Sequence, residues 1–223
     1  MTDINQMESK KIELMEEYFD KRVEVYDEIH GQTGISWGIQ IRDMVADYLP
    51  TNSKRILDLG CGTGLELEGV LKKAPNANIE CLDLSEKMLK KLKEKYPQEN
   101  VKVRKINFFD FCYPRDYYDV VISVMALHHF TEKEKNVLYK NIYDTLSNEG
   151  VFINSDYLID DPELEAKRFA YMEELKKQHP NELFHYDIPF TEEREHKVLV
   201  KSGFKQIEKI YENKKAKILV CKK

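Results

Sequence analysis

The sequence has little of what marks disordered, fibrous or membrane-spanning chains. It contains only 9 Gly and 7 Pro among 223 residues, and 42% of its residues are hydrophobic, which excludes collagen-like and low-complexity classes. Its longest apolar stretch runs from Val120 to Leu127, is interrupted by Ser123, and is far shorter than the ~20 residues of a membrane span. Met1 to Lys11 is polar and lacks the apolar core of a signal peptide. We therefore expect a soluble, cytoplasmic protein.

Cysteine pairs and an excess of positive charge are also absent. Cys61, Cys81, Cys112 and Cys221 lie far apart without a C-x-x-C pair, which argues against a zinc site or a disulfide framework, and we expect no metal. Lys and Arg number 35 against 40 Asp and Glu, giving a net charge of −5. Because phosphate neutralisation drives nucleic-acid binding, an acidic chain makes a nucleic-acid partner unlikely and favours a small-molecule partner.

From residue 54 onward the pattern alternates between short apolar runs and longer amphipathic segments. The runs predict strands, and the segments predict helices that are capped by Ser85, by a Thr131–Glu134 capping box and by Asp161. The predicted strands are 55–59, 78–84, 101–106, 120–125 and 151–157, and the predicted helices are 65–73, 85–96, 131–147 (with Gly150 past its end), 161–178 and 191–201. Such alternation is typical of βαβ units, and hence of an α/β fold with a parallel sheet.

The two ends of the chain depart from this alternation. Residues 204–211 and 217–221 predict two strands joined by a turn at 212–214, so the last strand is expected to enter the sheet antiparallel. The first fifty residues predict two helices, which are separated by Gly31 and Gly34 and end at Pro50. We expect residues 1–50 to form a helical lid and residues 51–223 the main part of a single domain.

The most informative segment is Asp58-Leu59-Gly60-Cys61-Gly62-Thr63-Gly64, which follows a predicted strand and opens a helix. Glycines at this place let the backbone approach a ligand closely. Their spacing differs from the G-x-G-x-x-G of dinucleotide sites, and no Gly-Lys-Ser/Thr of a phosphate loop follows. Asp58 would repel a pyrophosphate but attract a cationic ligand. Asp83, which ends the next strand, is suited to accept hydrogen bonds from both ribose hydroxyls of an adenosine.

Together these residues resemble the class I S-adenosylmethionine-dependent methyltransferases, over about residues 54–223. The glycine run is similar to that family's first motif, Asp83 to its ribose-binding acid, and Tyr118 through His129 to the motif on its fourth strand. The resemblance implies a Rossmann-like, doubly wound sheet of seven strands, mostly parallel with an antiparallel C-terminal hairpin strand. Tyr18-Phe19-Asp20 and Tyr26-Asp27 resemble the lid helix of the small-molecule and carboxy-S-adenosylmethionine-synthase-like branch.

The resemblance also implies roles for individual residues. S-adenosyl-L-methionine is the expected cofactor, and the residues expected to hold it are Asp58, Gly60, Cys61, Gly62, Gly64, Asp83, Leu84, Met88, Asn107, Phe108 and Val124. Either Asn107 or Asp110 would contact the adenine amino group. Tyr18, Tyr26 and Trp37 are candidates for contact with substrate or cofactor, although they could equally anchor an amphipathic helix. His128 and His129 are either acceptor-facing, with one of them a general base, or a structural pair at a strand end.

The methyl acceptor cannot be read from the sequence, and several functions stay open. A small-molecule methyltransferase is the leading hypothesis, and a methyltransferase acting on tRNA or another macromolecule is an alternative. A non-catalytic or cofactor-modifying S-adenosylmethionine-binding protein is a further one. Synthesis of carboxy-S-adenosylmethionine would require an arginine near the methyl group, for which Arg22 and Arg42 are the N-terminal candidates. A monomer and a homodimer are both compatible with the sequence.

Overall fold

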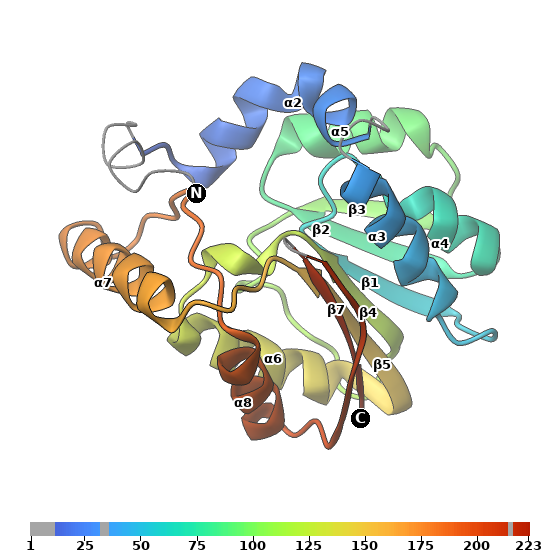
Figure 1. Cartoon of the computed structure of the whole chain (residues 1–223). Coiled ribbons are helices and arrows are strands. Elements are labelled where there is room, and N and C mark those ends of the chain that lie inside the picture. The colour runs from blue at the N-terminus through green and yellow to red at the C-terminus, as the bar shows by residue number, and fades with distance from the viewer. Residues whose placement is uncertain (1–11, 32–35, 214–215) are drawn as a thin grey trace.

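The computed structural model describes residues 12–31, 36–213 and 216–223, built around one seven-stranded sheet (Figure 1). Its strand order is β3-β2-β1-β4-β5-β7-β6. The strands are β1 (Arg55–Leu59), β2 (Asn78–Asp83), β3 (Val101–Lys105), β4 (Tyr118–Val124), β5 (Leu146–Asp156), β6 (Gln206–Glu212) and β7 (Lys217–Lys222). All neighbours pair in parallel except β7, which is antiparallel to both β5 and β6. The predicted Rossmann-like sheet with its antiparallel hairpin strand is confirmed.

Helices cover both faces of this sheet. They are α2 (Met15–Gly31), α3 (Ser36–Asp47), α4 (Leu67–Lys73), α5 (Glu86–Lys95), α6 (Glu132–Thr145), α7 (Pro162–Gln178) and α8 (Glu192–Ser202), with a short 3₁₀ turn η2 (Leu127–His129). Because side chains alternate along the strands, the two faces of the sheet contribute to two separate cores. Ile56 packs with residues of α3, α4 and α5 on one face, whereas its neighbour Leu57 packs with residues of α6 and α8 on the other.

Most helix ends lie where the sequence places them. Ser85 accepts a hydrogen bond from the Met88 amide, Thr131 and Glu134 form a complete capping box, and Asp161 caps α7. Thr191 caps α8, and Gly203, with φ +122°, ends it. These local hydrogen bonds satisfy backbone groups that a helix end leaves unpaired, which is why a sequence pattern can locate them.

The predicted boundary between α6 and β5 is wrong. The helix expected to reach Ser147 ends at Thr145, and β5 begins at Leu146, five residues before the predicted Val151. Leu146 is fully buried and pairs with Tyr118 across a bulge in β4, so tertiary pairing extends the chain where local preference favours a helix. Gly150 consequently lies inside β5 rather than past a helix end. The helix predicted from residue 65 also begins later, at Leu67.

The two N-terminal helices pack differently. Ile41 and Val45 of α3 belong to the core beneath the sheet, whereas α2 crosses above α5 at the carboxyl ends of the strands (Figure 1). Two short hydrogen bonds fasten α2 there: Ser85 donates to Asp20 and Thr63 donates to Asp27, both at 2.5 Å. Gly34 and the side chain of Trp37 lie outside the described part of the chain. None of the described helices is long and apolar enough to cross a membrane.

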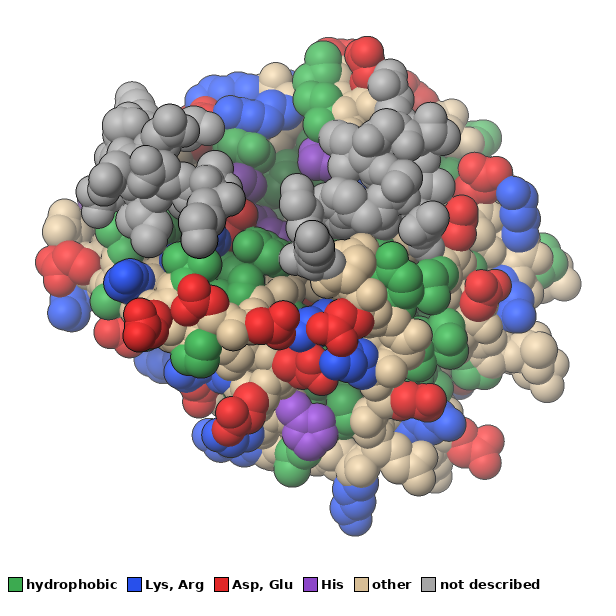
Figure 2. Space-filling model, in the orientation of Figure 1, with side chains coloured by type: hydrophobic (Ala, Val, Ile, Leu, Met, Phe, Trp, Pro, Cys, Tyr) green, Lys and Arg blue, Asp and Glu red, His purple; other side chains and the backbone are tan. Residues whose placement is uncertain are grey.

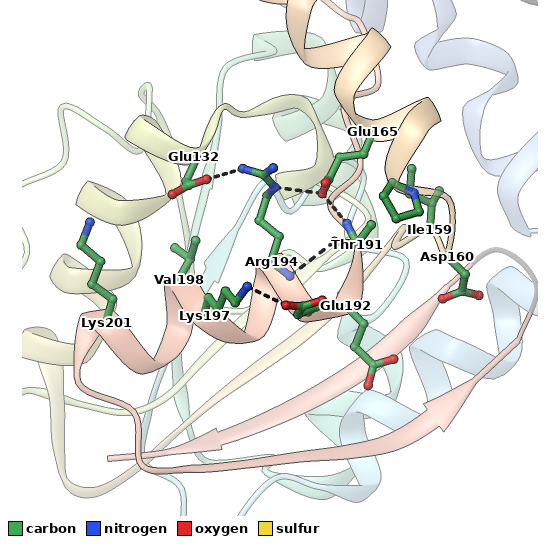
Figure 3. A pocket seen from close by; sticks show the side chains of 12 residues that line it. Glu132, Ile159, Asp160, Glu165, Thr191, Glu192, Arg194, Lys197, Val198 and Lys201 are labelled. Atoms are coloured by element: carbon green, nitrogen blue, oxygen red, sulfur yellow. Dashed lines mark hydrogen bonds and ion pairs between the residues drawn. The ribbon is translucent and has the colours of Figure 1, made fainter.

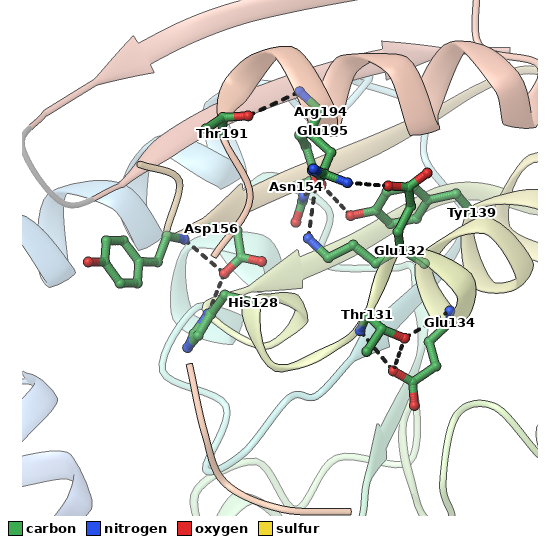
Figure 4. A network of polar contacts seen from close by, with 12 residues as sticks. His128, Thr131, Glu132, Glu134, Tyr139, Asn154, Asp156, Thr191, Arg194 and Glu195 are labelled. Carbon is green, nitrogen blue, oxygen red and sulfur yellow. Dashed lines mark hydrogen bonds and ion pairs between the residues drawn. The ribbon is translucent and has the colours of Figure 1, made fainter. Parts of the chain in front are cut away.

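A buried polar network joins α6, α8 and β5 (Figure 4). The Lys135 ammonium donates to Glu195 at 2.8 Å, and neither side chain is exposed to solvent. Tyr139 donates to the same carboxylate, as does the Asn154 amide at 3.0 Å. The negative charge of Glu195 is thus buried with one cation and two neutral donors, and removing the cation alone would leave that charge uncompensated.

We therefore predict that Lys135→Met lowers the free energy of unfolding by about 3–5 kcal/mol, because a buried carboxylate loses its counter-charge. Urea unfolding followed by circular dichroism measures the change. Lys133→Met, an exposed position on the same helix, is the matched control and should stay within about 0.5 kcal/mol of the unchanged protein. Equal stability of the two variants would contradict the role assigned to the ion pair.

Candidate active site

The glycine segment forms a tight loop between β1 and α4. Gly60 has φ +72°, and a Cβ placed there would lie 2.5 Å from the Cβ of Ala126, so the loops that follow β1 and β4 touch at this point. Gly62 has φ +52°, and the nearest atom to its missing Cβ is a ring carbon of Tyr26 at 4.0 Å. Only glycine fits the first position, and the second leaves room above the backbone for a ligand.

Asp83 lies at the end of β2 and faces this loop. Its Oδ2 accepts the Gly62 amide at 2.9 Å and its Oδ1 accepts the Ser85 amide at 2.8 Å. Burial raises the pKa of this carboxyl group, although the amides of Ser85 and Gly62 oppose that effect. The Leu84 amide also donates to this carboxylate, which has about four acceptor positions, so Asp83 can hold the loop and still accept from a ribose hydroxyl.

A mainly apolar cavity begins at Asp83 and the glycine loop. Predicted site residues that line it are Gly60, Gly62, Asp83, Leu84, Met88, Phe108, Val124, His129 and Tyr26. Residues that line it but that the sequence did not single out for the site are Met15, Phe19, Met125, Ala126 and Phe130. The cavity is small, about 60 Å³ in this structure, and combines one acidic side chain with aromatic and aliphatic ones. These are the groups that contact the ribose and the base of an adenosine.

Other predicted residues lie around the cavity rather than in its lining. Gly64 packs against Leu92, whose Cγ would be 2.9 Å from an added Cβ, and Cys61 is buried in the core beneath the loop. Asn107 accepts the Phe109 amide through its side-chain oxygen at 3.0 Å, and Asp110 is exposed. Neither Asn107 nor Asp110 lines the cavity, whereas Phe108, which lies between them in the sequence, does.

Two buried carboxyl groups stand beneath the loop. Asp58 is 1% exposed, and neither of its oxygens has a hydrogen-bond partner among the described residues; Glu66 has one such oxygen. Burial, and then the neighbouring Glu66, raise the pKa of Asp58 well above its usual range. Both groups lie beneath the loop rather than in the cavity lining. The lining itself, with Asp83 suited to a ribose and apolar side chains suited to an adenine, fits S-adenosylmethionine.

The predicted histidines lie beside the cavity on η2, just after β4. His128 Nδ1 is 2.6 Å from Asp156 Oδ1, and Asp156 also accepts the Tyr157 amide (Figure 4). Burial lowers the pKa of His128, but the charge and hydrogen bond of Asp156 outweigh it, so the pKa is raised. Burial lowers the pKa of His129 well below its usual range, and the charge of His128 adds to that effect. Sequence reasoning did not find Asp156, because it is joined to His128 only by the pairing of β4 with β5.

A loop between α7 and α8 closes this side of the site. Ile188 donates its amide to the His128 carbonyl at 2.8 Å, and His185 donates its own to the Glu13 carbonyl at 3.0 Å. The His185 ring stacks on Tyr18 with centroids 3.4 Å apart. Figure 2 shows histidine and hydrophobic side chains together in a hollow of the same face. Tyr18 therefore contacts the loop, while Tyr26 contacts the cavity.

The N-terminal arginines are occupied elsewhere. Arg22 donates to Glu13 and to the Tyr18 carbonyl, both at 2.9 Å, and Arg42 donates to the His30 carbonyl at 2.5 Å. Among the described residues that line the cavity, none is an arginine or a lysine. A negatively charged transferred group therefore has no cationic partner in that lining.

A second hollow, of about 520 Å³, lies at the amino end of α8 (Figure 3). Its charged side chains pair with one another: Arg194 contacts Glu132 at 2.5 Å and Glu165 at 3.1 Å. None of the glycine-loop or histidine residues lines it. These pairs tie α6, α7 and α8 together, and the residues expected to bind cofactor are gathered at the other cavity.

Comparison with known proteins agrees with this geometry. A family model described as a methyltransferase domain matches residues 56–150. The carboxy-S-adenosyl-L-methionine synthase of Nautilia profundicola is 28% identical over 218 residues, covering 91% of this chain and 92% of that protein. The malonyl-(acyl-carrier protein) O-methyltransferase 2 of Ilyobacter polytropus is 30% identical over 176 residues, covering 71% of this chain and 64% of that protein.

Solved structures share the fold. Human N-acetylserotonin methyltransferase in complex with S-adenosylmethionine superposes with a TM-score of 0.65 at 18% identity, covering 93% of this chain and 56% of that one. The chain belongs to the class I S-adenosylmethionine-dependent methyltransferases, and S-adenosylmethionine is its cofactor. Within that family it falls in the branch that contains the carboxy-S-adenosylmethionine synthases.

We predict that Asp83→Ala weakens binding of S-adenosylhomocysteine by about 1.5–3 kcal/mol, because two charge-assisted hydrogen bonds to the ribose are lost. Titration calorimetry measures the affinity, and circular dichroism checks that the fold survives loss of the Gly62 contact. Asp43→Ala, at an exposed position of α3, is the control and should bind as the unchanged protein does. Unaltered affinity in Asp83→Ala would show that the ribose acid is misassigned.

Proposed function

We propose that the protein transfers a methyl group from S-adenosylmethionine to a small-molecule acceptor that binds against the histidines of η2. The observation that carries this proposal is the continuity of the site. The cavity that begins at the glycine loop and Asp83 reaches His129, whose neighbour His128 is oriented by Asp156. Cofactor-holding and acceptor-activating groups thus meet at one place. The two lie under α2 and the loop of residues 183–189, an enclosure that favours a small acceptor over a macromolecule.

Each part of the chain has a distinct task in this proposal. When bound, S-adenosylmethionine supplies an electrophilic methyl group on a sulfonium. Asp83 would hold the ribose, and Phe108 and Met88 the adenine. Met15, Phe19 and Tyr26 of α2 cover the cavity and exclude water, so that acceptor and methyl group are held in line.

His128 is the residue assigned to acceptor activation. Its Nδ1–H donates to Asp156, which fixes the tautomer and leaves a lone pair on Nε2. That nitrogen points away from the buried carboxylate and toward Asp187, 3.6 Å away at the open side of the site. Asp156 is therefore a positioning residue, and Nε2 of His128 is the atom that acts on the acceptor side.

Synthesis of carboxy-S-adenosylmethionine is the second candidate function, because the similar protein of Nautilia profundicola is a carboxy-S-adenosyl-L-methionine synthase. It would need a cation beside the transferred carboxylate. The described cavity lining offers no arginine or lysine, and Arg22 and Arg42 are engaged by Glu13 and by backbone carbonyls. Methyl transfer is therefore the function that the site supports best.

We predict that His128→Ala lowers turnover on a small hydroxyl or amine acceptor by roughly 10²–10⁴, while affinity for S-adenosylhomocysteine stays within about threefold. Transfer of a radiolabelled methyl group to a panel of such acceptors provides the measurement. Asp156→Asn should also lower turnover, because the amide no longer holds the same tautomer.

His196→Ala is the control, since His196 is exposed on α8 and should leave turnover unchanged. Full activity of both His128→Ala and His129→Ala at every pH from about 6 to 9 would show that these residues are structural. Formation of a carboxylated cofactor instead of a methylated acceptor would favour the second candidate.

A further inference from the structure

His128, His129 and Asp187 form a compact group of nitrogen and oxygen ligands on the acceptor side of the cavity. One atom from each lies within 4.8 Å of the other two. Asp187 Oδ1 is 3.6 Å from His128 Nε2 and 3.4 Å from His129 Nδ1. Ligand atoms that share one ion at about 2.0–2.2 Å lie roughly 3.0–3.5 Å apart, so the two distances from Asp187 are close to those around a bound ion, and a small closure of the group would complete the site.

We propose that these three residues bind a divalent first-row transition-metal ion, which activates the acceptor. The role in catalysis rests on the proposed function, whereas the binding of the ion does not. The sequence predicts no metal, because its cysteines are scattered, the two histidines are adjacent and Asp187 comes from a distant loop. Only the docking of that loop on η2, through the Ile188 amide and the His128 carbonyl, brings the three together.

The distances separate this interpretation from a simple ion pair. A charge-assisted N–H···O bond is normally about 2.7–2.9 Å long, and His128 makes one of 2.6 Å with Asp156. The separations of Asp187 Oδ1 from the two ring nitrogens, 3.4 and 3.6 Å, are longer than such a bond. His129 Nδ1 is also 3.3 Å from the Tyr186 carbonyl, and an ion bound to Nδ1 would replace this hydrogen bond.

The surroundings of His128 supply a second, independent observation. Metal-bound histidines usually donate their other ring N–H to a carboxylate, which fixes the tautomer and orients the ring. Asp156 does this here from a position that is 1% exposed, and its Oδ2 has no other partner among the described residues. The carboxylate–histidine pair thus directs the lone pair of Nε2 toward Asp187.

The three ligand side chains are not equally buried, so the group is open to solvent on one side. The side chains of His128 and His129 are 8% and 3% exposed, whereas that of Asp187 is 35% exposed. An ion held by three protein ligands would keep open positions on the Asp187 side for water or an acceptor. Three ligands with open positions are typical of metal ions that act catalytically.

The ligand set limits the kind of ion. Two imidazoles and one carboxylate suit Zn²⁺, Mn²⁺, Fe²⁺, Co²⁺ or Ni²⁺, whereas Mg²⁺ and Ca²⁺ prefer oxygen ligands alone. An acceptor hydroxyl bound at an open position would release its proton to solvent at a lower pH than in water. His128 then acts on the acceptor through the ion, as a ligand rather than as a free base.

Titration calorimetry of the chelator-treated full chain with Zn²⁺ or Mn²⁺ alone tests the proposal without any acceptor. We expect one ion per chain, and Asp187→Asn should weaken binding by at least 10-fold. Asp156→Asn, which leaves all three ligands in place, should weaken it by about 10–100-fold through loss of ring orientation. His196→Asn and Asp43→Asn, both at exposed positions, are the matched controls and should bind the ion as the unchanged protein does.

Absence of binding up to millimolar ion, or equal binding by the unchanged protein and Asp187→Asn, would overturn the proposal. Circular dichroism, and binding of S-adenosylhomocysteine by each variant, separate a lost site from a lost fold. Methyl transfer at full rate in the presence of chelator would overturn the proposed catalytic role of the ion and leave the proposed function standing. Specific ion binding without methyl transfer to any acceptor would contradict the proposed function and leave the metal site standing.

Discussion

The hydrogen bond from the Gly62 amide to Asp83 joins the ends of β1 and β2, and the whole site depends on it. It holds the glycine loop in a conformation that only glycine adopts readily, against Ala126 from the loop after β4. The ends of three neighbouring strands are thereby fixed within one small region. Because parallel strands all end at the same edge of a sheet, cofactor and acceptor groups are positioned by rigid elements rather than by mobile loops.

The fold was largely predictable because its signals are local. Capping residues such as Ser85 and Thr131, and the glycine spacing after β1, each involve neighbours within a few residues along the chain. The prediction failed around Leu146, where the deciding contact is with Tyr118 in another strand. Local preference there favours a longer helix, and sheet pairing overrides it.

The site was predictable only in part, for the same reason. Gly60, Gly62, Asp83 and His129, which the sequence singles out, line one cavity, and their roles stay predictions. Asp156 and Asp187 approach the histidines from elements far along the chain and belong to no motif, so neither could be found in advance. The residues proposed to hold the cofactor thus belong to short motifs, whereas those proposed to face the acceptor are brought together by packing. The sequence therefore does not identify the acceptor.

The attachment of α2 has a consequence for its response to salt. Besides its two short hydrogen bonds, α2 is held by partly exposed ion pairs, such as Lys95 with Asp27 and Lys105 with Glu16. Exposed pairs of this kind contribute about 0–1 kcal/mol each and weaken as ionic strength rises. The attachment of α2 over the cavity should therefore loosen as salt is added.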